Sequence, residues 1–284
     1  MTAAWRSLLF SPATDEARLA KAHTRGADAL ILDLEDALPA DAKVAGRAAA
    51  RVWIERLAGL GQDVVVRINT PWLMAVADLD AVVRPGLKAL LVPKAEDAGQ
   101  LSVIAAMVGE LEAERGLPAG GIGLLALIET PAAFSRLAEI AAVERVRGLA
   151  LGPEDLSLSL GAPPSPLTLD LPCRMIALAA ATRGLMALGA PISIAEFRDL
   201  EAYRGAVETA RGMGLSGNLC VHPHQVEVVN AVFAPQAAEV ADARAVLAAW
   251  QAGEGKGVVA LEGRMIDLPV VERARRVLAR AGET

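Results

Sequence analysis

The stretch Ala29–Leu38, ALILDLEDAL, runs from an unbroken apolar segment directly into three acidic residues. An apolar segment without polar alternation is typical of a strand that is covered on both faces. Acidic side chains beside a packed core are costly unless something neutralises or uses them. The stretch therefore indicates a buried parallel strand with a cluster of carboxylates at its carboxyl end.

Short apolar segments of the same kind recur along the chain, separated by longer amphipathic segments. The residue ranges expected to be strands are 7–12, 29–35, 63–69, 89–94, 123–130, 148–155, 191–195 and 218–223. The intervening segments carry apolar residues at helical spacing, and Gly26, Gly116, Gly189 and Gly214 stand where a helix would end. This alternation favours βαβ units and parallel strand pairing.

Eight such units within the first 235 residues match a (β/α)8 TIM barrel in number and length. A doubly wound α/β sheet is the alternative, but no GxGxxG motif follows the first expected strand. After Pro235 the pattern changes to a helix, a glycine-broken strand-like segment and a second helix. We expect a catalytic barrel over residues 1–235 and a C-terminal lid over 236–284, which is too short to be stable alone and should pack on the barrel or on a neighbouring subunit.

Composition and charge exclude several classes of protein. The chain has 284 residues, 54% of them hydrophobic, and a net charge of −6, which argues against a nucleic-acid partner because phosphates require a basic surface. No apolar run approaches the roughly 18–20 residues that span a bilayer, and no signal peptide is recognisable. Two cysteines form neither a disulfide framework nor a zinc site. We expect a cytoplasmic protein that does not bind membranes.

Two carboxylates end consecutive expected strands, where the active site of a TIM barrel lies. These are Glu129 and Asp155, and neighbouring carboxylates of this kind can share one hard cation. Mg²⁺ typically takes one or two protein carboxylates and keeps positions for a chelating substrate such as a 2-oxo acid. The alternative is that each acid caps the helix that follows, as the sequence ETPAAF suggests for Thr130.

Arg67 ends the third expected strand and is a candidate for binding substrate oxygens. A guanidinium binds a carboxylate through two hydrogen bonds and stays charged at any working pH. A structural ion pair with the acids of Ala29–Leu38 is the alternative, and the two roles are compatible. Farther along, the Gly-Pro step at Pro153 could present backbone N–H groups to an anionic substrate, while Glu154 is expected to face solvent or begin a helix.

The acids of the opening stretch divide by their position on the strand. Strand alternation would turn Asp33 and Glu35 into the barrel and Leu34 toward the helices, while Asp36 begins the loop. Since better direct ligands for a metal lie elsewhere, Glu35 and Asp36 are interpreted as holding metal-bound water and orienting Arg67. Asp33 is expected to be structural and paired deeper in the barrel.

The order of these segments resembles the citrate lyase β-subunit family, within the HpcH/HpaI aldolase superfamily that includes citryl-, malyl- and citramalyl-CoA lyases. The similar segments, from about residue 6 to residue 280, are RSLLFSPATDE, ADALILDLEDALPADAK, VVVRINTPW, LLVPKAE, LLALIETPAA, ALGPEDLSLSLG, GLSGNLCVHPHQVEVVNAVFAP and EGRMIDLPVVERARRVL. DLEDA, RIN and IET are specific when they occur together in this order. The resemblance implies a TIM barrel with a C-terminal lid, assembled into homotrimers or homohexamers.

The resemblance also implies roles for individual residues. It places the metal ligands on Glu129 and Asp155 and the arginine that binds the substrate carboxylate on Arg67. It further implies that Asp267, in the segment MID, reaches the active site of a neighbouring subunit as an acid/base. The alternative for Asp267 is a helix N-cap ahead of LPVVERA.

The resemblance also implies contacts with coenzyme A, and the chain departs from the family pattern at two positions. Phe10 and Lys21 match positions that touch coenzyme A in relatives. Ser193 stands where relatives often carry Asp, and Ala202 where they often carry Gly. Ser193 leaves open the polarity of the substrate pocket and the acyl chain that it accepts.

The implied activity is Mg²⁺-dependent cleavage of a 3-hydroxyacyl-CoA thioester to an acyl-CoA and a 2-oxo acid, with Mn²⁺ as an alternative cation. Three other functions stay open: a class II aldolase acting on free 2-oxo acids, a malate-synthase or thioesterase type of activity, and a non-catalytic subunit of a lyase complex. The GRMID segment favours a CoA thioester, because shorter aldolases lack it. The joint presence of Arg67, Glu129, Asp155 and Asp267 argues against a non-catalytic subunit.

Overall fold

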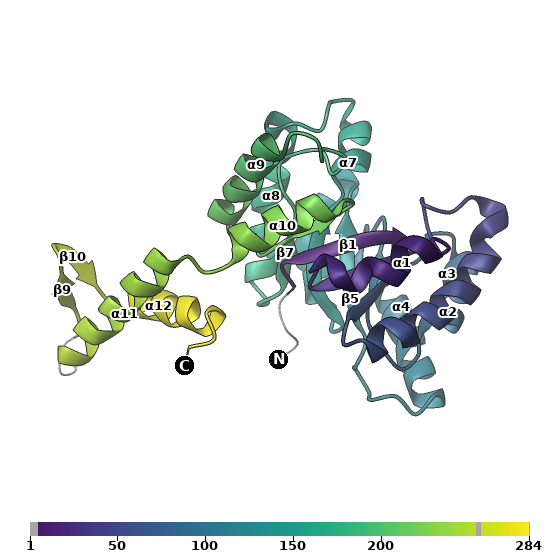
Figure 1. The fold of residues 1–284 in the computed structure, drawn as a ribbon, viewed down its shortest axis with the longest axis horizontal. Coiled ribbons are helices and arrows are strands. Elements are labelled where there is room, and N and C mark those ends of the chain that lie inside the picture. Colours follow the sequence, from purple (N-terminus) through teal and green to yellow (C-terminus); the bar gives the residue numbers. More distant parts are fainter. Residues whose placement is uncertain (1–4, 254–256, 284) are drawn as a thin grey trace. The chain divides into compact units, whose positions relative to one another are not determined.

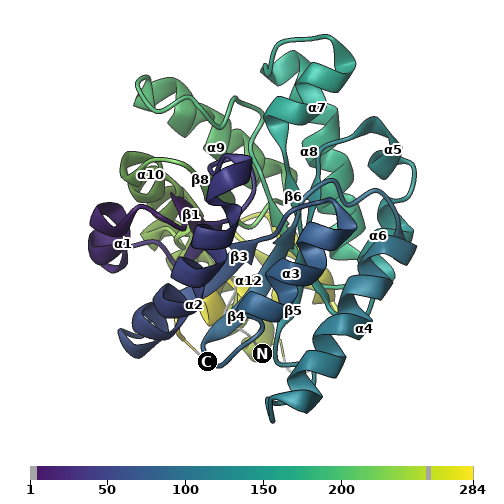
Figure 2. The same cartoon turned by 90° about the vertical axis from the view of Figure 1, so that its right-hand side faces the viewer.

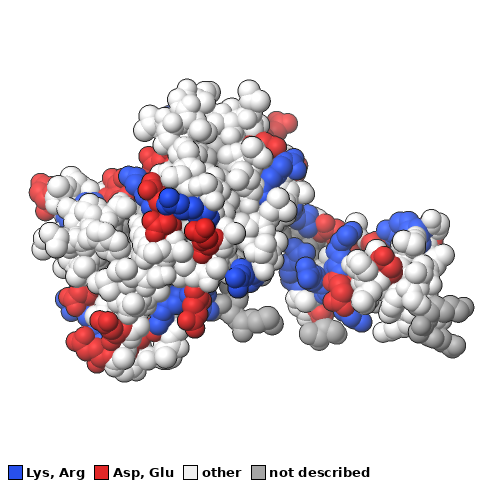
Figure 3. All heavy atoms as spheres, turned by 180° about the vertical axis from the view of Figure 1, so that it is seen from behind, with Lys and Arg blue, Asp and Glu red and all other residues white. Residues whose placement is uncertain are grey.

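The structure, a computed structural model, describes residues 5–253 and 257–283. The chain forms two compact units, residues 1–232 and 233–284 (Figure 1). No helix among the described residues is long and apolar enough to cross a membrane. Acidic and basic side chains are interspersed over the face of the protein shown in Figure 3.

The first unit is the TIM barrel that the sequence predicts. Its parallel strands are β1 (Ser7–Pro12), β2 (Ala29–Asp33), β3 (Asp63–Arg67), β4 (Leu87–Val92), β5 (Gly123–Ile128), β6 (Val146–Leu151), β7 (Met186–Leu188) and β8 (Asn218–Cys220). They pair in chain order, and β1 also pairs with β8. A bridge between Leu188 and Gly217 closes the remaining gap between β7 and β8, where Gly189 N donates to Gly217 O at 2.9 Å.

Helices surround the strands (Figure 2). They are α1 (Glu16–Ala22), α2 (Lys43–Gly59), α3 (Trp72–Val82), α4 (Ala98–Glu114), α5 (Pro131–Phe134), α6 (Leu137–Ala142), α7 (Pro153–Leu160), α8 (Pro166–Ala181), α9 (Leu200–Met213) and α10 (Pro223–Phe233), with 3-10 turns η1 (His23–Arg25) and η2 (Ala40–Ala42). Because the helices cover the outer face of the sheet and side chains fill the barrel, all five residues of β2 are buried. This double burial explains why residues 29–32 form an unbroken apolar segment.

The interior of the barrel is filled by apolar side chains that alternate along the strands. The fully enclosed cluster includes Leu8, Ala29, Ile31, Val65, Ala89, Leu91, Leu125, Leu127, Ala150, Leu188 and Leu219. Trp5 packs against this cluster, and its indole N–H donates to Asp63 Oδ2 at 2.8 Å. Asp63 begins β3, so Trp5 covers the amino-terminal end of the barrel and leaves the carboxyl end for polar groups.

The seventh strand lies at Met186–Leu188, and the expectation of a strand at 191–195 was wrong. Helix α8 ends before Gly184, whose φ of +65° turns the chain into the short strand at once. Gly189, expected to end a helix, instead follows this strand with a φ of +152°. A Cβ there would lie 2.9 Å from Leu151 Cβ, so glycine is needed where the chain leaves the sheet.

The second unit has the helix, strand and helix order that the sequence predicts. It consists of α11 (Ala237–Ala252), the antiparallel hairpin of β9 (Val259–Leu261) and β10 (Arg264–Ile266), and α12 (Leu268–Arg280). Glu262 and Gly263, the two residues between the strands, both have positive φ, as expected for a tight two-residue hairpin. A small apolar cluster that includes Val246, Ile266 and Val271 holds the unit together.

A buried carboxylate on α4 fixes the turn that leads into β5. The Glu112 side chain, with the residue only 1% exposed, accepts hydrogen bonds from Gly120 N and Ile122 N, both at 2.9 Å. It also accepts from both Nη atoms of Arg145 at 3.0 and 2.7 Å. Burial acts to raise the pKa of Glu112, but the hydrogen bonds from Arg145, Ile122 and Gly120 outweigh it and hold this pKa below its usual value.

We expect Glu112→Gln to lower the free energy of unfolding by about 2–4 kcal/mol at neutral pH, because Arg145 loses a buried counterion. A carboxylate with a depressed folded-state pKa contributes stability above its unfolded-state pKa and loses it as pH falls through the folded-state pKa. Urea unfolding should therefore show a smaller difference at acid pH. Glu114→Gln, on the exposed side of the same helix, is the control and should change stability by less than about 0.5 kcal/mol. Equal stability of the two variants would contradict the role given to Glu112.

Candidate active site

A guanidinium surrounded by carboxylates lies at the carboxyl end of the barrel. Arg67 ends β3 beside Asp33, its register partner at the end of β2. Its Nε and Nη2 donate to the two oxygens of Asp33 at 2.8 and 2.6 Å, while Nη1 lies 3.0 Å from Glu35 Oε2 and 3.1 Å from Asp36 Oδ2. Burial acts to lower the pKa of Arg67, but these carboxylates outweigh it and hold that pKa above its usual value. Arg67 therefore stays charged and is held in one orientation.

Asp33 pairs with Arg67 and lines the same cavity, whereas a partner deeper in the barrel was expected, and it also orders the loop that follows β2. Besides Arg67, it accepts hydrogen bonds from Glu35 N at 2.9 Å and from Ala37 N at 3.2 Å. Leu34 is fully buried and packs toward α2, where a Cβ on Gly46 would lie 3.3 Å from its Cδ2. The alternation predicted for this stretch is therefore present: its acids face the site and Leu34 faces the helices.

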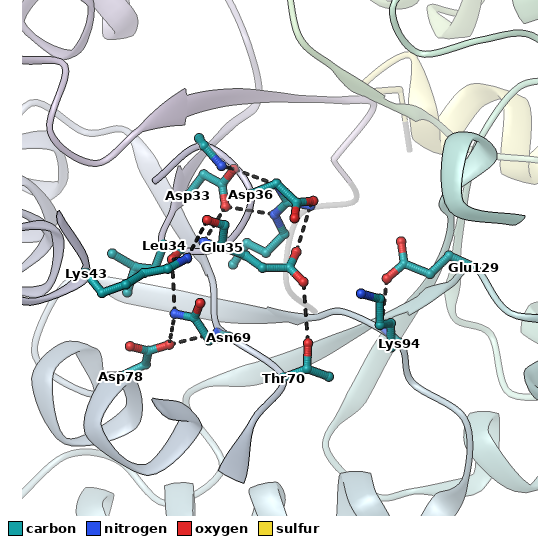
Figure 4. A network of polar contacts seen from close by, with 12 residues as sticks. Asp33, Leu34, Glu35, Asp36, Lys43, Asn69, Thr70, Asp78, Lys94 and Glu129 are labelled. Atoms are coloured by element: carbon teal, nitrogen blue, oxygen red, sulfur yellow. Dashed lines mark hydrogen bonds and ion pairs between the residues drawn. The ribbon is translucent and has the colours of Figure 1, made fainter. Parts of the chain in front are cut away.

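A layer of polar contacts behind the loop holds its backbone (Figure 4). Lys43 Nζ donates to the carbonyl oxygens of Leu34 and Glu35 at 2.8 and 2.6 Å. Asn69 Nδ2 donates to Leu34 O at 3.0 Å and to the fully buried Asp78 at 2.7 Å. Two helices, α2 and α3, thus fix the backbone from which Glu35 and Asp36 reach Arg67.

Glu129 is a second buried carboxylate, directly after β5. Its Oε1 accepts a hydrogen bond of 2.7 Å from the backbone N–H of Lys94 (Figure 4). Lys94 has a φ of +46°, which is rare for a residue with a side chain, so local strain directs this N–H at the carboxylate. Burial raises the pKa of Glu129 to about 8; the Lys94 N–H acts against this rise, and the negative charges of Asp155 and Glu35 add to it.

The carboxyl end of β6 supplies the third part of the site. The strand ends at Leu151, and Pro153 begins α7, so Asp155 lies in the first turn of this helix rather than on the strand expected over 148–155. The proline at the first helical position explains the early end of the strand. The helix dipole favours an acid in the first turn of a helix. Asp155 holds this position and lies half-buried beside the cavity.

Gly152 makes room for Glu129. A Cβ at Gly152 would lie 2.4 Å from Glu129 Oε2 and 2.5 Å from Glu129 Cβ. No real Cβ approaches these atoms so closely, so a side chain at this position would displace the carboxylate. The role expected for the Gly-Pro step was to present backbone N–H groups; the close approach of Glu129 to Gly152 could not be predicted, because Glu129 follows another strand.

These groups line one cavity of about 390 Å³. The predicted site residues that line it are Phe10, Asp36, Arg67, Glu129, Pro153, Glu154 and Asp155. The guanidinium carbon of Arg67 lies 4.9 Å from the centre of the Phe10 ring, a cation–π contact that covers one face of the cation. Burial raises the pKa of Glu35 to about 7; Arg67 acts against this rise, and Asp36 adds to it.

The donor set fits a hard divalent cation. Glu129 and Asp155 line the same cavity, and the negative charge of Asp155 adds to the rise in the pKa of Glu129. In the described part of the chain, no three His, Cys, Asp or Glu side chains form a complete metal centre. Two carboxylates with the remaining positions left to water or substrate are what Mg²⁺ accepts. The assignment of these two ligands stays a prediction that the geometry suits.

Three predicted residues are not part of the cavity lining: Glu35, Lys21 and Asp267. Glu35 contacts the lining through Arg67. Lys21 is exposed on α1, and Arg18, one turn earlier on the same helix, lines the cavity instead. Asp267 is the N-cap of α12, where its side chain accepts a hydrogen bond from Val270 N at 3.3 Å. Asp267 therefore caps α12, which was the alternative expected for it. The role of Asp267 in the active site of a neighbouring subunit stays a prediction. Helical spacing of three from Lys21 could have pointed to Arg18.

The chain is similar to known proteins over its whole length. The family model described as HpcH/HpaI aldolase/citrate lyase matches residues 6–223. A (3S)-malyl-CoA thioesterase of Cereibacter sphaeroides is 34% identical over 284 residues, which cover 98% of this chain and 94% of the relative. Citrate lyase subunit beta of Escherichia coli is 34% identical over 285 residues, covering 97% and 93%. The structure of CitE from Mycobacterium tuberculosis in complex with magnesium, acetoacetate and coenzyme A aligns over 100% of both chains, with a TM-score of 0.78 and 33% identity.

We expect Gly152→Ala to weaken Mg²⁺ binding by roughly 10–100-fold, since the added methyl group displaces Glu129 from its place beside Lys94 N. Titration calorimetry with MgCl₂ measures the change, and circular dichroism checks that the barrel stays folded. Gly205→Ala is the matched control, because an added Cβ in the middle of α9 meets nothing within 4 Å. Wild-type Mg²⁺ affinity in Gly152→Ala would refute the placement of the cation at Glu129.

Proposed function

Since this chain belongs to the HpcH/HpaI aldolase/citrate lyase family, we propose that it is a Mg²⁺-dependent carbon–carbon lyase acting on a 3-hydroxyacyl-CoA thioester of the citryl-, malyl- or citramalyl-CoA type. The products are acetyl-CoA, or another acyl-CoA, and a 2-oxo acid. The observation that carries the proposal is a single cavity in which a guanidinium held by three carboxylates shares the lining with Glu129 and Asp155.

Glu129 and Asp155 are the residues that would hold the cation. When bound, Mg²⁺ supplies Lewis-acid polarisation of the substrate hydroxyl and carboxylate and fixes their orientation. The buried position of Glu129 and its hydrogen bond from Lys94 N fix this ligand before substrate arrives. This arrangement needs no Schiff base, and the exposed side chain of Lys94 is not required as a nucleophile.

Arg67 stabilises negative charge on substrate oxygen as it develops. Four of its five N–H groups face Asp33, Glu35 and Asp36, which leaves an Nη2 N–H for the substrate. Asp33 accepts two hydrogen bonds from this guanidinium, so the guanidinium cannot rotate away during the reaction. Glu35 and Asp36 act by orienting Arg67 and ordering water beside the cation.

The reaction transfers one proton away from the substrate and one proton back. A base takes the hydroxyl proton, the oxygen forms a carbonyl, and the adjacent carbon–carbon bond breaks. Its electron pair forms the enolate of the acyl-CoA, which an acid protonates at carbon, so that acyl-CoA and 2-oxo acid leave. Asp267 of a neighbouring copy is the proposed acid/base, within a homotrimer or homohexamer whose C-terminal units cover the sites.

Known relatives support the thioester and the cation. The CitE relative was solved with magnesium, acetoacetate and coenzyme A, and another structure, of a citrate lyase beta subunit from the same organism, was solved with oxaloacetate and magnesium. A relative at 34% identity is a (3S)-malyl-CoA thioesterase, so hydrolysis of the thioester is the second candidate activity. Free coenzyme A as a product would indicate hydrolysis, and acetyl-CoA would indicate the lyase.

We expect purified protein with Mg²⁺ to release acyl-CoA from at least one of citryl-, malyl- and citramalyl-CoA, and Glu129→Ala to release none. Asp155→Ala should abolish Mg²⁺ binding in calorimetry and keep the thermal transition of the fold. Asp170→Ala is the control, because Asp170 is an exposed acid on α8 that pairs with Arg174. Turnover of free hydroxy-oxo acids without turnover of any thioester would favour an aldolase and exclude the proposed function.

Asp267→Asn is expected to reduce turnover roughly 10²–10⁴-fold with unchanged Mg²⁺ affinity, because asparagine keeps the helix cap but cannot transfer a proton. Co-expression of Glu129→Ala and Asp267→Asn chains tests action between subunits. Mixed oligomers contain sites with an intact metal centre and an intact neighbouring Asp267, so they should recover part of the activity. Wild-type activity of Asp267→Asn alone would leave Asp267 only its capping role.

A further inference from the structure

The loop between β7 and α9, residues 189–199, is fixed from two sides at Ile194. Ile194 N donates to Glu154 Oε1 at 3.1 Å, and Ser193 Oγ donates to the same oxygen at 2.6 Å. Ile194 O accepts from Gln225 Nε2 at 2.8 Å. The backbone at Ile194 is therefore bound through both its N–H and its C=O, to residues from α7 and α10.

Gln225 makes this attachment rigid. Its side chain is fully buried, and Nε2 donates to Glu196 O at 2.8 Å as well as to Ile194 O. Its Oε1 accepts from Val221 N at 2.8 Å and from His222 N at 3.0 Å. One glutamine thus joins the loop after β7 to the loop after β8, and the side chain of Ile194 is held against the barrel core.

Ile194 and Arg67 both line the cavity. In a closed ring of eight strands, β3 and β7 are four strands apart in either direction. Arg67 ends β3, and Ile194 follows β7, so a small molecule held at Arg67 and the metal carboxylates presents its far side to Ile194. Leu219 and Val221 extend this apolar wall.

The apolar wall at Ile194 contains no cation that could pair with a second carboxylate of the substrate. Of the described residues that line the cavity, the cations are Arg67 and Arg18. Arg67 is already paired with three carboxylates, and Arg18 has a side chain 57% exposed and paired with Asp15 at 3.3 Å. Glu154, which fixes the loop, adds a negative charge beside Ile194. A carboxylate placed beside Ile194 would lose water and meet apolar side chains and the like charge of Glu154, while both arginines of the lining already have carboxylate partners.

We propose that Ile194, held in place by Glu154 and Gln225, is the residue that selects the 2-oxo acid. It favours a monocarboxylic 2-oxo acid with hydrogen or a small alkyl group on the carbonyl carbon, and it rejects a dicarboxylic 2-oxo acid. The catalytic meaning of this selection rests on the proposed function. The preference for one 2-oxo acid over another is a property of binding and can be measured without turnover. Among the thioesters, it corresponds to the malyl- or citramalyl-CoA type over the citryl-CoA type.

Calorimetry of the whole protein saturated with Mg²⁺, using pyruvate and oxaloacetate as the probes, tests the selection. The wild type should bind pyruvate at least about tenfold more tightly than oxaloacetate, as expected when a second carboxylate finds no cation. Ile194→Arg supplies that cation and should bring the ratio close to one or reverse it. Ile194→Leu, the matched control, keeps the apolar wall and should keep the wild-type ratio.

A second variant covers the case in which Ile194→Arg fails to fold. Glu154→Gln keeps the acceptor oxygen for Ser193 and Ile194 but removes the negative charge, so oxaloacetate should gain several-fold relative to pyruvate. Equal affinity of the wild type for both acids, or an unchanged ratio in a folded Ile194→Arg and in Glu154→Gln, would overturn the proposal.

Turnover separates this inference from the proposed function. Selective binding of pyruvate without cleavage of any CoA thioester would exclude the lyase and leave the selection by Ile194 intact. Cleavage of citryl-CoA as efficiently as citramalyl-CoA would exclude the selection and leave the lyase intact.

Discussion

The ion pair between Asp33 and Arg67 determines the arrangement of the whole cavity. The two residues are register partners at the ends of adjacent parallel strands, so the sheet itself brings the carboxylate and the guanidinium together. Asp33 also accepts backbone hydrogen bonds from Glu35 and Ala37, which ties the loop to the same carboxylate. A buried ion pair contributes little net stability by itself, so this one is better understood as a device that fixes geometry.

The fixed geometry carries an excess of negative charge that the protein alone does not neutralise. Arg67 offsets part of the charge of its three carboxylate neighbours, but burial still raises the pKa of Glu35 to about 7 and that of Glu129 to about 8. The strained backbone of Lys94 and the absence of a side chain at Gly152 both serve to hold Glu129 in this costly place. Burial of these carboxylates is costly unless something neutralises them, and the proposed cation at Glu129 and Asp155 would do so.

Features of the fold and the site could be predicted from the sequence where a residue type has one physical explanation. They could not be predicted where residues distant in the chain determine them. The unbroken apolar character of residues 29–32 follows from burial on both faces, so the barrel could be predicted. The seventh strand could not, because residues 191–195 are apolar for another reason: Ile194 faces the cavity and the barrel core from a loop. The need for glycine at Gly152 could not be predicted, because only the folded chain brings Glu129 within contact of it. The cap on Asp267 could be predicted, since a carboxylate ahead of Leu-Pro is a local signal.

Different interactions hold the two halves of the cavity in place. The half built on β2, β3 and β5 holds charged groups in a network where each member fixes the next, so a change at Asp33 or Glu129 would disturb several partners. The half built on β7 and β8 is held by Glu154 and Gln225 through backbone groups of the loop, which leaves the side chain of Ile194 free to differ. Ser193 fits this arrangement as an uncharged donor to Glu154, whereas an aspartate there would place two carboxylates together and break the attachment. If Ile194 selects the substrate as proposed, chemistry and substrate choice can change separately in this barrel, because the contacts that hold this loop use the backbone of Ile194 and not its side chain.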